Sequence, residues 1–143
     1  MAPEIVGAGF SWPTRVYWED TDAGGVVYHA QYLAFVERAR TEWLRAHGYG
    51  QELLRIEYDL VFAVRAMTID FRLPARLDDA LQVGVALSEC RRASLVIAQT
   101  IERLKPHAAL LAEAAVAFSI NCSGQSLRDE KFTDYICSLV RAS

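Results

Sequence analysis

The chain has 143 residues, of which 52% are hydrophobic and 23% are charged. This length suits one domain, and the apolar content is sufficient for a continuous core. Fifteen Lys and Arg against 18 Asp and Glu give a formal charge of −3. No overall positive field therefore attracts nucleic acid or anionic membranes, and we expect neither as a partner.

Two further features bear on where the protein works. Residues 1–10 lack the basic region and apolar segment of a secretion signal, and no run of about 18 apolar residues predicts a membrane span. The three cysteines, Cys90, Cys122 and Cys137, are widely spaced and odd in number, which favours neither a disulfide framework nor a zinc site. We expect a cytoplasmic protein with reduced thiols.

The N-terminal third predicts a strand, a turn and a helix. Polar and apolar residues alternate over Pro13–Glu19, as in a strand. The segment Asp20–Gly25 is dense in residues that favour turns. In Ala30–His47 apolar residues recur close to the 3.6-residue period, and Gly48 is placed to cap a helix. This is the one long helix that the sequence predicts.

The remaining two thirds predict mostly strands. Alternating or continuous apolar runs occur over 60–71, 81–87, 95–101 and 110–120, separated by turn-forming residues. Helical spacing returns near the C-terminus and predicts a short helix over about 129–141.

A strand, one long helix and then an antiparallel meander is an α+β order. A lone helix with a wide apolar stripe needs a sheet wrapped around it, which is the hotdog arrangement. We expect a single hotdog domain over residues 1–143, with its core at about 12–122. Such a sheet has an edge strand and an incompletely covered face, which favours pairing with a second copy, so we expect at least a homodimer.

The segment Glu19–His29 is the most informative for chemistry, because it places carboxylates in a glycine-bearing loop just before the long helix. A helix N-terminus offers free backbone N–H groups and a positive dipole end to a developing oxyanion. Asp22 would then lie near a polarised thioester, either to attack its carbon or to activate water. The backbone or ring of His29 would assist, and Gly25 would let the backbone approach the substrate closely.

The same residues also have plainer interpretations. An Asp in a glycine-rich turn before a helix most often caps the helix or stabilises the turn. Asp20 and Asp22 beside glycines resemble a calcium loop faintly, but the further oxygen ligands and closing Glu are missing. We therefore expect no metal at this loop.

A family resemblance strongly favours the catalytic interpretation. The run RVYWEDTDAGGVVYH over 15–29 resembles the signature of the YbgC-like acyl-CoA thioesterases, in the 4-hydroxybenzoyl-CoA thioesterase branch of the hotdog superfamily. The likeness extends to about Ala117 and fades beyond Asn121. It continues through the following segments: Tyr32, Glu37–Glu42, Val64–Thr68, Pro74–Asp79 and Ser94–Val96.

The resemblance implies a thioesterase that hydrolyses acyl-CoA to a free acid and CoA. Asp22 matches the family's catalytic aspartate and His29 its active-site histidine. Independently of the resemblance, Gly25 and Tyr28 are candidates for substrate contact, Tyr28 as an aromatic residue that could line an acyl pocket, although such residues more often belong to the core. The resemblance further implies a homodimer or homotetramer with clefts at the subunit interfaces, and no metal or redox cofactor.

Outside this loop, two further sets of residues are candidates. Glu37 lies about two turns beyond His29, where some hotdog thioesterases place their carboxylate, although a solvated or ion-paired helix residue is the commoner case. Arg91 and Arg92 form a basic pair at a predicted turn that would suit the phosphates of CoA, with Ser94 a weaker contact.

Two rival functions remain open on the sequence alone. One is a hotdog dehydratase acting on a hydroxyacyl thioester through His29 and Glu37. The other is a non-catalytic, envelope-associated module that binds acyl carrier protein, which is also the alternative thiol carrier for a thioesterase.

Overall fold

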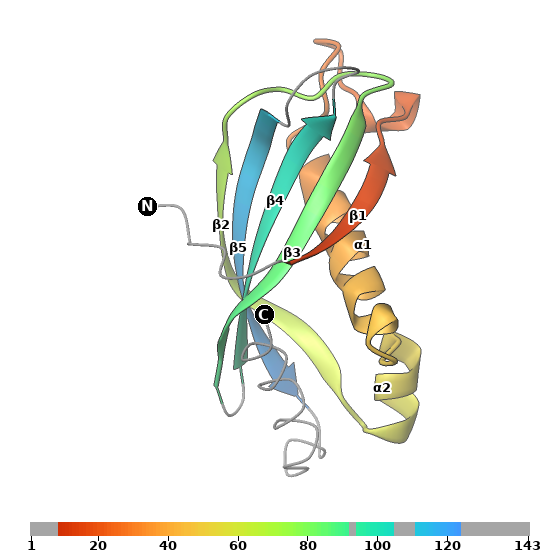
Figure 1. The fold of residues 1–143 in the computed structure, drawn as a ribbon, viewed down its shortest axis with the longest axis vertical. Helices are drawn as coiled ribbons and strands as arrows, with labels where there is room; N and C mark the ends of the chain where they lie inside the picture. Colours follow the sequence, from red (N-terminus) through yellow and green to blue (C-terminus); the bar gives the residue numbers. More distant parts are fainter. Residues whose placement is uncertain (1–8, 92–93, 105–110, 124–143) are drawn as a thin grey trace.

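The computed structural model describes residues 9–91, 94–104 and 111–123, the last range as backbone. Its elements in chain order are β1 (Phe10–Arg15), the 3-10 turn η1 (Trp18–Asp20), α1 (Gln31–Ala46), α2 (Gln51–Glu57), β2 (Val61–Phe71), β3 (Ala80–Cys90), β4 (Ser94–Leu104) and β5 (Leu111–Ser123). They form one antiparallel sheet with α1 lying along one of its faces (Figure 1). The predicted α+β class is thereby confirmed.

The order of the strands in the sheet is β1-β3-β4-β5-β2. Only β3, β4 and β5 form the expected meander, because β2 pairs with β5 at the far edge instead of with β3. Both sides of β3 are already hydrogen-bonded, one to β1 and the other to β4. The connection over 72–79 therefore crosses the end of the sheet from one edge toward the other (Figure 1).

The helix α1 spans 16 residues and lies against β1 and β3. Its boundaries match the prediction to within one residue. Phe35, Val36 and Ala39 are fully buried on its inner face, and they meet the buried row of β3 that includes Leu81 and Val83. Burying each large apolar side chain contributes roughly 1.5–3 kcal/mol, so this contact fixes the helix on the sheet.

Two predictions about local structure were wrong. The strand expected to reach Glu19 ends at Arg15, and Trp18–Asp20 turns instead because a carboxylate oxygen of Asp20 accepts the Tyr17 N–H at 2.8 Å. The helix α2 was missed because Leu54 is its one buried residue, and seven residues show no clear period.

The remaining expectations concern the cysteines, the C-terminal helix and a membrane span. Cys90 is disulfide-bonded, so the expectation of reduced thiols is wrong for this residue. Its partner lies outside the residues whose side chains are described, and so does the helix expected over 129–141. Among the helices that the structure describes, none has both the length and the apolar character to cross a bilayer.

The two edge strands of the sheet differ in character. β1 has six residues and contains Pro13, which cannot donate a backbone hydrogen bond. β2 has eleven residues and leaves Val64, Met67 and Phe71 more than 40% exposed. An edge that is long, apolar and free of proline is the one suited to pairing with another strand.

Candidate active site

The loop before α1 is a closed turn. Thr21 and Val27 form an antiparallel bridge, and inside it the N–H of Asp22 donates to the carbonyl of Val26 at 2.8 Å. The N–H of Gly25 donates back to the carbonyl of Asp22 at 3.0 Å. Gly25 has φ of +78°, a left-handed conformation that favours glycine.

The carboxylate of Asp22 is exposed, and one of its oxygens is fixed by the turn. Oδ1 accepts the N–H of Gly24 at 2.8 Å and, at 3.5 Å, lies at the limit of a bond from Val26. A Cβ on Gly24 would lie 3.1 Å from this oxygen, so glycine permits the close approach. Within the described part of the chain, Oδ2 makes no hydrogen bond.

The buried side chain of the neighbouring Asp20 fixes the start of the loop. It is 3% exposed, and its Oδ2 accepts the Tyr17 N–H at 2.8 Å while its Oδ1 accepts Nε2 of Gln31 at 2.7 Å. Its carbonyl also accepts the Tyr28 N–H at 2.9 Å. One buried carboxylate thus ties the start of the loop to the first residue of α1.

A second anchor comes from the connection between β2 and β3. The N–H of Val27 donates to the carbonyl of Ala75 at 2.8 Å, and the N–H of Ala75 donates to the hydroxyl of Tyr32 at 3.0 Å. Val26 and Arg76 form a further bridge. The loop is therefore held between α1 and the 72–79 connection.

The other predicted residues of this region lie at the entrance to α1. His29 and Tyr28 are both exposed, and their rings lie 4.5 Å apart at an angle of 56°. The carbonyl of Tyr28 accepts the N–H of Gln31 at 2.8 Å. Among the described residues, no backbone carbonyl accepts the N–H of His29. The structure brings Asp22, Gly25, Tyr28 and His29 into one loop.

Arg91 and Ser94, two of the predicted phosphate contacts, lie at the other end of the sheet. Ala80 at the start of β3 pairs with Arg15, which leads into the loop, while Arg91 follows the last residue of β3. Eleven strand residues separate the two ends by roughly 35 Å. Within one chain, Arg91 and Ser94 are thus far from Asp22.

The turn between β3 and β4 is closed by a bond from the Arg91 N–H to the Ser94 carbonyl at 2.9 Å. The side chain of Arg91 is exposed and donates to Glu89 at 2.7 Å. This hydrogen bond, and the charge of Glu89, raise the pKa of Arg91. Arg92 lies outside the described residues.

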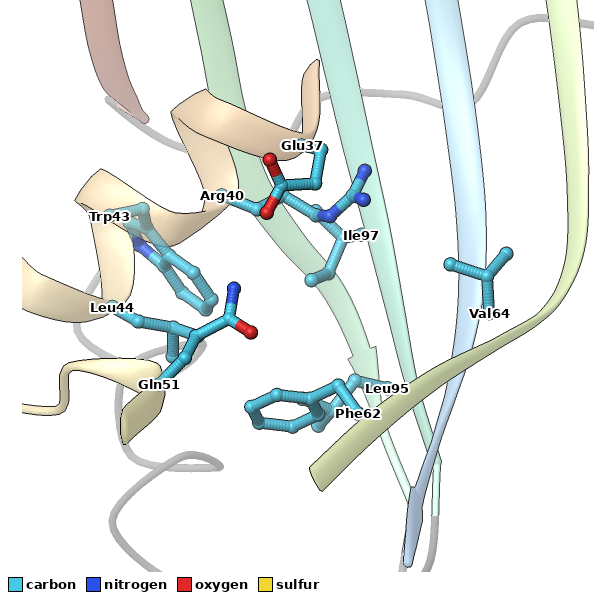
Figure 2. A pocket seen from close by; sticks show the side chains of 9 residues that line it. All are labelled: Glu37, Arg40, Trp43, Leu44, Gln51, Phe62, Val64, Leu95 and Ile97. Carbon is cyan, nitrogen blue, oxygen red and sulfur yellow. The ribbon is translucent and has the colours of Figure 1, made fainter. Parts of the chain in front are cut away.

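A pocket of about 220 Å³ lies between α1 and the sheet, further along the helix than the loop (Figure 2). Glu37, Arg40 and Gln51 form its polar wall. Its apolar wall consists of Trp43, Leu44, Phe62, Val64, Leu95 and Ile97. Glu37 is exposed, as expected for a solvated helix residue, and it also borders this cavity.

Sequence reasoning missed two features of this region. Asp20 was interpreted as a turn residue or as part of a faint calcium loop, and its bond to Gln31 spans eleven positions that form no periodic pattern. The pocket escaped because its walls come from α1, α2, β2 and β4, which only the tertiary fold brings together. The sequence held one signal for this region. Gln99 on β4 is a polar residue in the same buried row as Leu95, Ile97 and Ile101, and a buried polar side chain usually has a hydrogen-bond partner.

Comparisons with known proteins agree with this architecture. Residues 24–110 match the thioesterase superfamily. The acyl-CoA thioester hydrolase YbgC of Escherichia coli O6:H1 is 55% identical over 92 residues, which cover 64% of this chain and 68% of that protein.

Solved structures confirm the hotdog thioesterase fold. A probable thioesterase from Bartonella henselae is 34% identical, with a TM-score of 0.74 over 85% of this chain and 96% of the other. A variant of 4-hydroxybenzoyl-CoA thioesterase complexed with 4-hydroxybenzoyl-CoA has a TM-score of 0.76 over 80% and 83% of the two chains, at 18% identity. The match over residues 24–110 and the similarity to the Escherichia coli hydrolase show that this chain belongs to the thioesterase superfamily.

Proposed function

We propose that the protein hydrolyses acyl-CoA thioesters to a carboxylic acid and free CoA, with Asp22 as the carboxylate that carries the chemistry. The observation that carries this proposal is the hydrogen bonding and exposure of the Asp22 side chain. The turn fixes Oδ1 through the Gly24 N–H, and the Asp22 side chain is exposed in the loop that leads into α1. The activity named for the Escherichia coli relative supports the same reaction.

Two routes use this carboxylate. In one, Oδ2 forms a bond to the thioester carbon, the carbon–sulfur bond breaks, and CoA leaves as a thiolate. Water then cleaves the resulting mixed anhydride to the acid and restores Asp22. In the other route, Asp22 takes a proton from water while the water oxygen attacks the same carbon, and the departing thiolate is protonated.

The entrance to α1 would stabilise the negative charge on the thioester oxygen in either route. The N–H of His29 and the positive end of the helix dipole are placed beside the loop, and donors fixed in advance cost no reorganisation during the reaction. Gly25 and Tyr28 would border the substrate on the exposed side of the loop.

We further propose that the complete site is formed by two copies of the chain. Within one chain roughly 35 Å of strand separates Arg91 from the loop. A second copy that paired along the exposed edge of β2 would run antiparallel to the first. It would bring its own β3–β4 turn, with Arg91, Arg92 and Ser94, toward the first copy's loop, where these residues would hold the phosphates of CoA.

Thiol release from a panel of short, long and aromatic acyl-CoAs tests the reaction, with acyl carrier protein thioesters as the alternative carrier. We expect turnover of at least one acyl-CoA, and a loss of roughly 10²–10⁴-fold in kcat for Asp22→Asn. Asn keeps the Oδ1 acceptor for Gly24, so the turn is preserved. Glu19→Gln removes a charge from an exposed neighbour and serves as the matched control.

Folded protein that is silent on every thioester would overturn hydrolysis and favour a binding role. Hydration of crotonyl-CoA in place of thiol release would favour the dehydratase. Turnover of acyl carrier protein thioesters alone would replace CoA as the carrier.

A further inference from the structure

The pocket between α1 and β2 contains polar groups that the reaction at Asp22 does not use. Figure 2 shows the Glu37 carboxylate and the Arg40 guanidinium on the helix side of the cavity, with Phe62 and Val64 of β2 across from them. An amphipathic cavity of this kind selects ligands by the few polar groups it presents.

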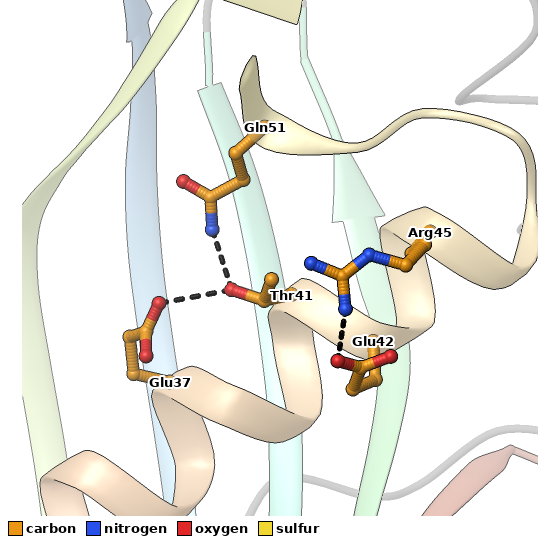
Figure 3. Close-up of polar contacts among 5 residues, drawn as sticks. All are labelled: Glu37, Thr41, Glu42, Arg45 and Gln51. Carbon is orange, nitrogen blue, oxygen red and sulfur yellow. Dashed lines mark hydrogen bonds and ion pairs between the residues drawn. The ribbon is translucent and has the colours of Figure 1, made fainter. Parts of the chain in front are cut away.

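Hydrogen bonds to neighbouring side chains hold the polar wall in place. The Thr41 hydroxyl donates to Oε1 of Glu37 at 2.9 Å, and Nε2 of Gln51 donates to that hydroxyl at 2.6 Å (Figure 3). Arg40 donates to Oε1 of the buried Gln99 at 2.9 Å, and Gln99 in turn donates to the carbonyl of Val36 at 3.0 Å. These bonds restrict both charged groups to the cavity side of α1.

Opposite charges on one wall decide which ligand chemistry fits. Burial lowers the pKa of Arg40 to about 10, and the nearby charge of Glu37 acts in the opposite direction. Arg40 is a donor at neutral pH and Glu37 an acceptor, and their charges cancel. An anionic group would meet the Glu37 carboxylate, whereas a methyl group would desolvate both residues without any bond in return. A hydroxyl both donates and accepts, so it suits the pair.

The position of the pocket relates it to the proposed thioester site. Glu37 lies six residues beyond Gln31, where α1 begins, or about 9 Å along the helix axis. A thioester whose carbonyl faced the first turn of α1 would extend its acyl group along the helix toward this cavity.

We infer that the pocket formed by Glu37, Arg40, Gln51, Phe62, Val64 and Ile97 receives the distal end of the acyl group and selects acyl chains of medium length that carry a hydroxyl there. This inference rests on the proposed hydrolysis at Asp22. Glu37 and Arg40 act here as specificity residues that contact the substrate far from the reacting carbon.

Relative kcat/KM values for ω-hydroxydecanoyl-CoA and decanoyl-CoA test the selection. We expect the parent to favour the hydroxylated substrate by about ten-fold, the effect of one hydrogen bond to a charged group. Glu37→Leu removes the acceptor and should bring the ratio to about one. Glu42→Leu is the control, because Glu42 pairs with Arg45 and does not border the pocket (Figure 3).

Three results would overturn the inference if thioesters are hydrolysed. They are a parent ratio near one, a ratio that Glu37→Leu leaves unchanged, and a preference for an ω-carboxyl chain over the ω-hydroxyl chain. The last result would mean that Arg40 alone selects the substrate.

Calorimetric binding of free ω-hydroxydecanoate separates the pocket from the reaction, because it needs no turnover. We expect the parent to bind this acid more tightly than decanoate, and Val64→Phe to weaken both by filling the cavity from the exposed edge strand. Selective binding by a protein that hydrolyses no thioester would support the pocket and overturn the hydrolysis. Hydrolysis without selective binding would support the reaction at Asp22 and overturn the role of the pocket.

Discussion

The loop that carries Asp22 precedes α1 and the pocket beside Glu37 lies along it, but the two are built in different ways. The loop is closed by bonds between near neighbours in the chain, such as Gly24 to Asp22 and Gly25 to Asp22. The pocket joins α1 to residues of β2 and β4 that are distant in sequence. The proposed reacting carboxylate is therefore positioned by local bonds, while the proposed acyl preference depends on the tertiary fold.

The largest change we expect outside the reacting residue is loss of the dimer that would complete the site. Met67→Asp adds a charge to the exposed apolar edge of β2, where a second strand would have to bury it. Sedimentation equilibrium should show a dimer for the parent and a monomer for the variant, with thiol release strongly reduced.

Ser11→Asp provides the control on the opposite edge, since it adds the same charge to β1 near Pro13. Dissociation caused by the β1 variant and not by the β2 variant would place the interface on β1 and contradict our proposal.

The next largest effect concerns the anchor of the loop. Asp20→Ala leaves the Tyr17 N–H and the Gln31 side chain without their carboxylate partner, which should lower the free energy of unfolding by about 2 kcal/mol. We also expect a lower kcat, because the loop loses its tie to α1. Urea unfolding and thiol release measure the two effects, and Glu19→Ala is the exposed neighbour for comparison. Parent-like activity in Asp20→Ala would show that the anchor does not position Asp22.

A smaller effect tests the backbone of the same loop. Gly25→Ala places a Cβ at φ of +78° with no atom within 4 Å, so strain alone should cost about 1 kcal/mol. Gly50→Ala is a matched control, because Gly50 also has open space but a φ of −59°. Equal stability of the two variants in urea would argue against a strained turn at Gly25.

The smallest effect is expected at the distant turn. Arg91→Ala should raise KM for acyl-CoA several-fold and weaken the dependence of KM on salt, because an exposed contact to phosphate is screened. Arg55→Ala removes an arginine that is paired with Glu52 in the same exposed manner, and it should leave KM unchanged. A KM for Arg91→Ala equal to that of the parent would remove this turn from the proposed CoA site.

How much the sequence could predict follows the same division. The helix over Ala30–His47 and the strand rows containing Leu81 and Ile97 carry periodic patterns, and the structure confirms them. The turn around Asp22 was predicted because its residues favour turns locally. The position of β2 at the far edge was not predicted, since strand pairing depends on contacts between distant segments that no local pattern records.

The candidate site divides in the same way. Asp22, Gly25, Tyr28 and His29 were identified together because they are neighbours in the chain. The anchoring role of Asp20 was missed, because nothing in the sequence indicates that its carboxylate is buried against Gln31. The sequence also could not predict that Arg91 lies at the end of the sheet opposite the loop, since this depends on the direction of β3.

Single-turnover thiol release by Asp22→Asn and Glu37→Gln, measured side by side on the preferred acyl-CoA, tests the central claim most directly. We predict that Asp22→Asn loses the chemical step by roughly 10²–10⁴-fold, while Glu37→Gln retains hydrolysis and changes the preference among acyl groups. Loss of the chemical step in Glu37→Gln, together with rapid thiol release by Asp22→Asn, would contradict the account and move the reacting carboxylate onto α1.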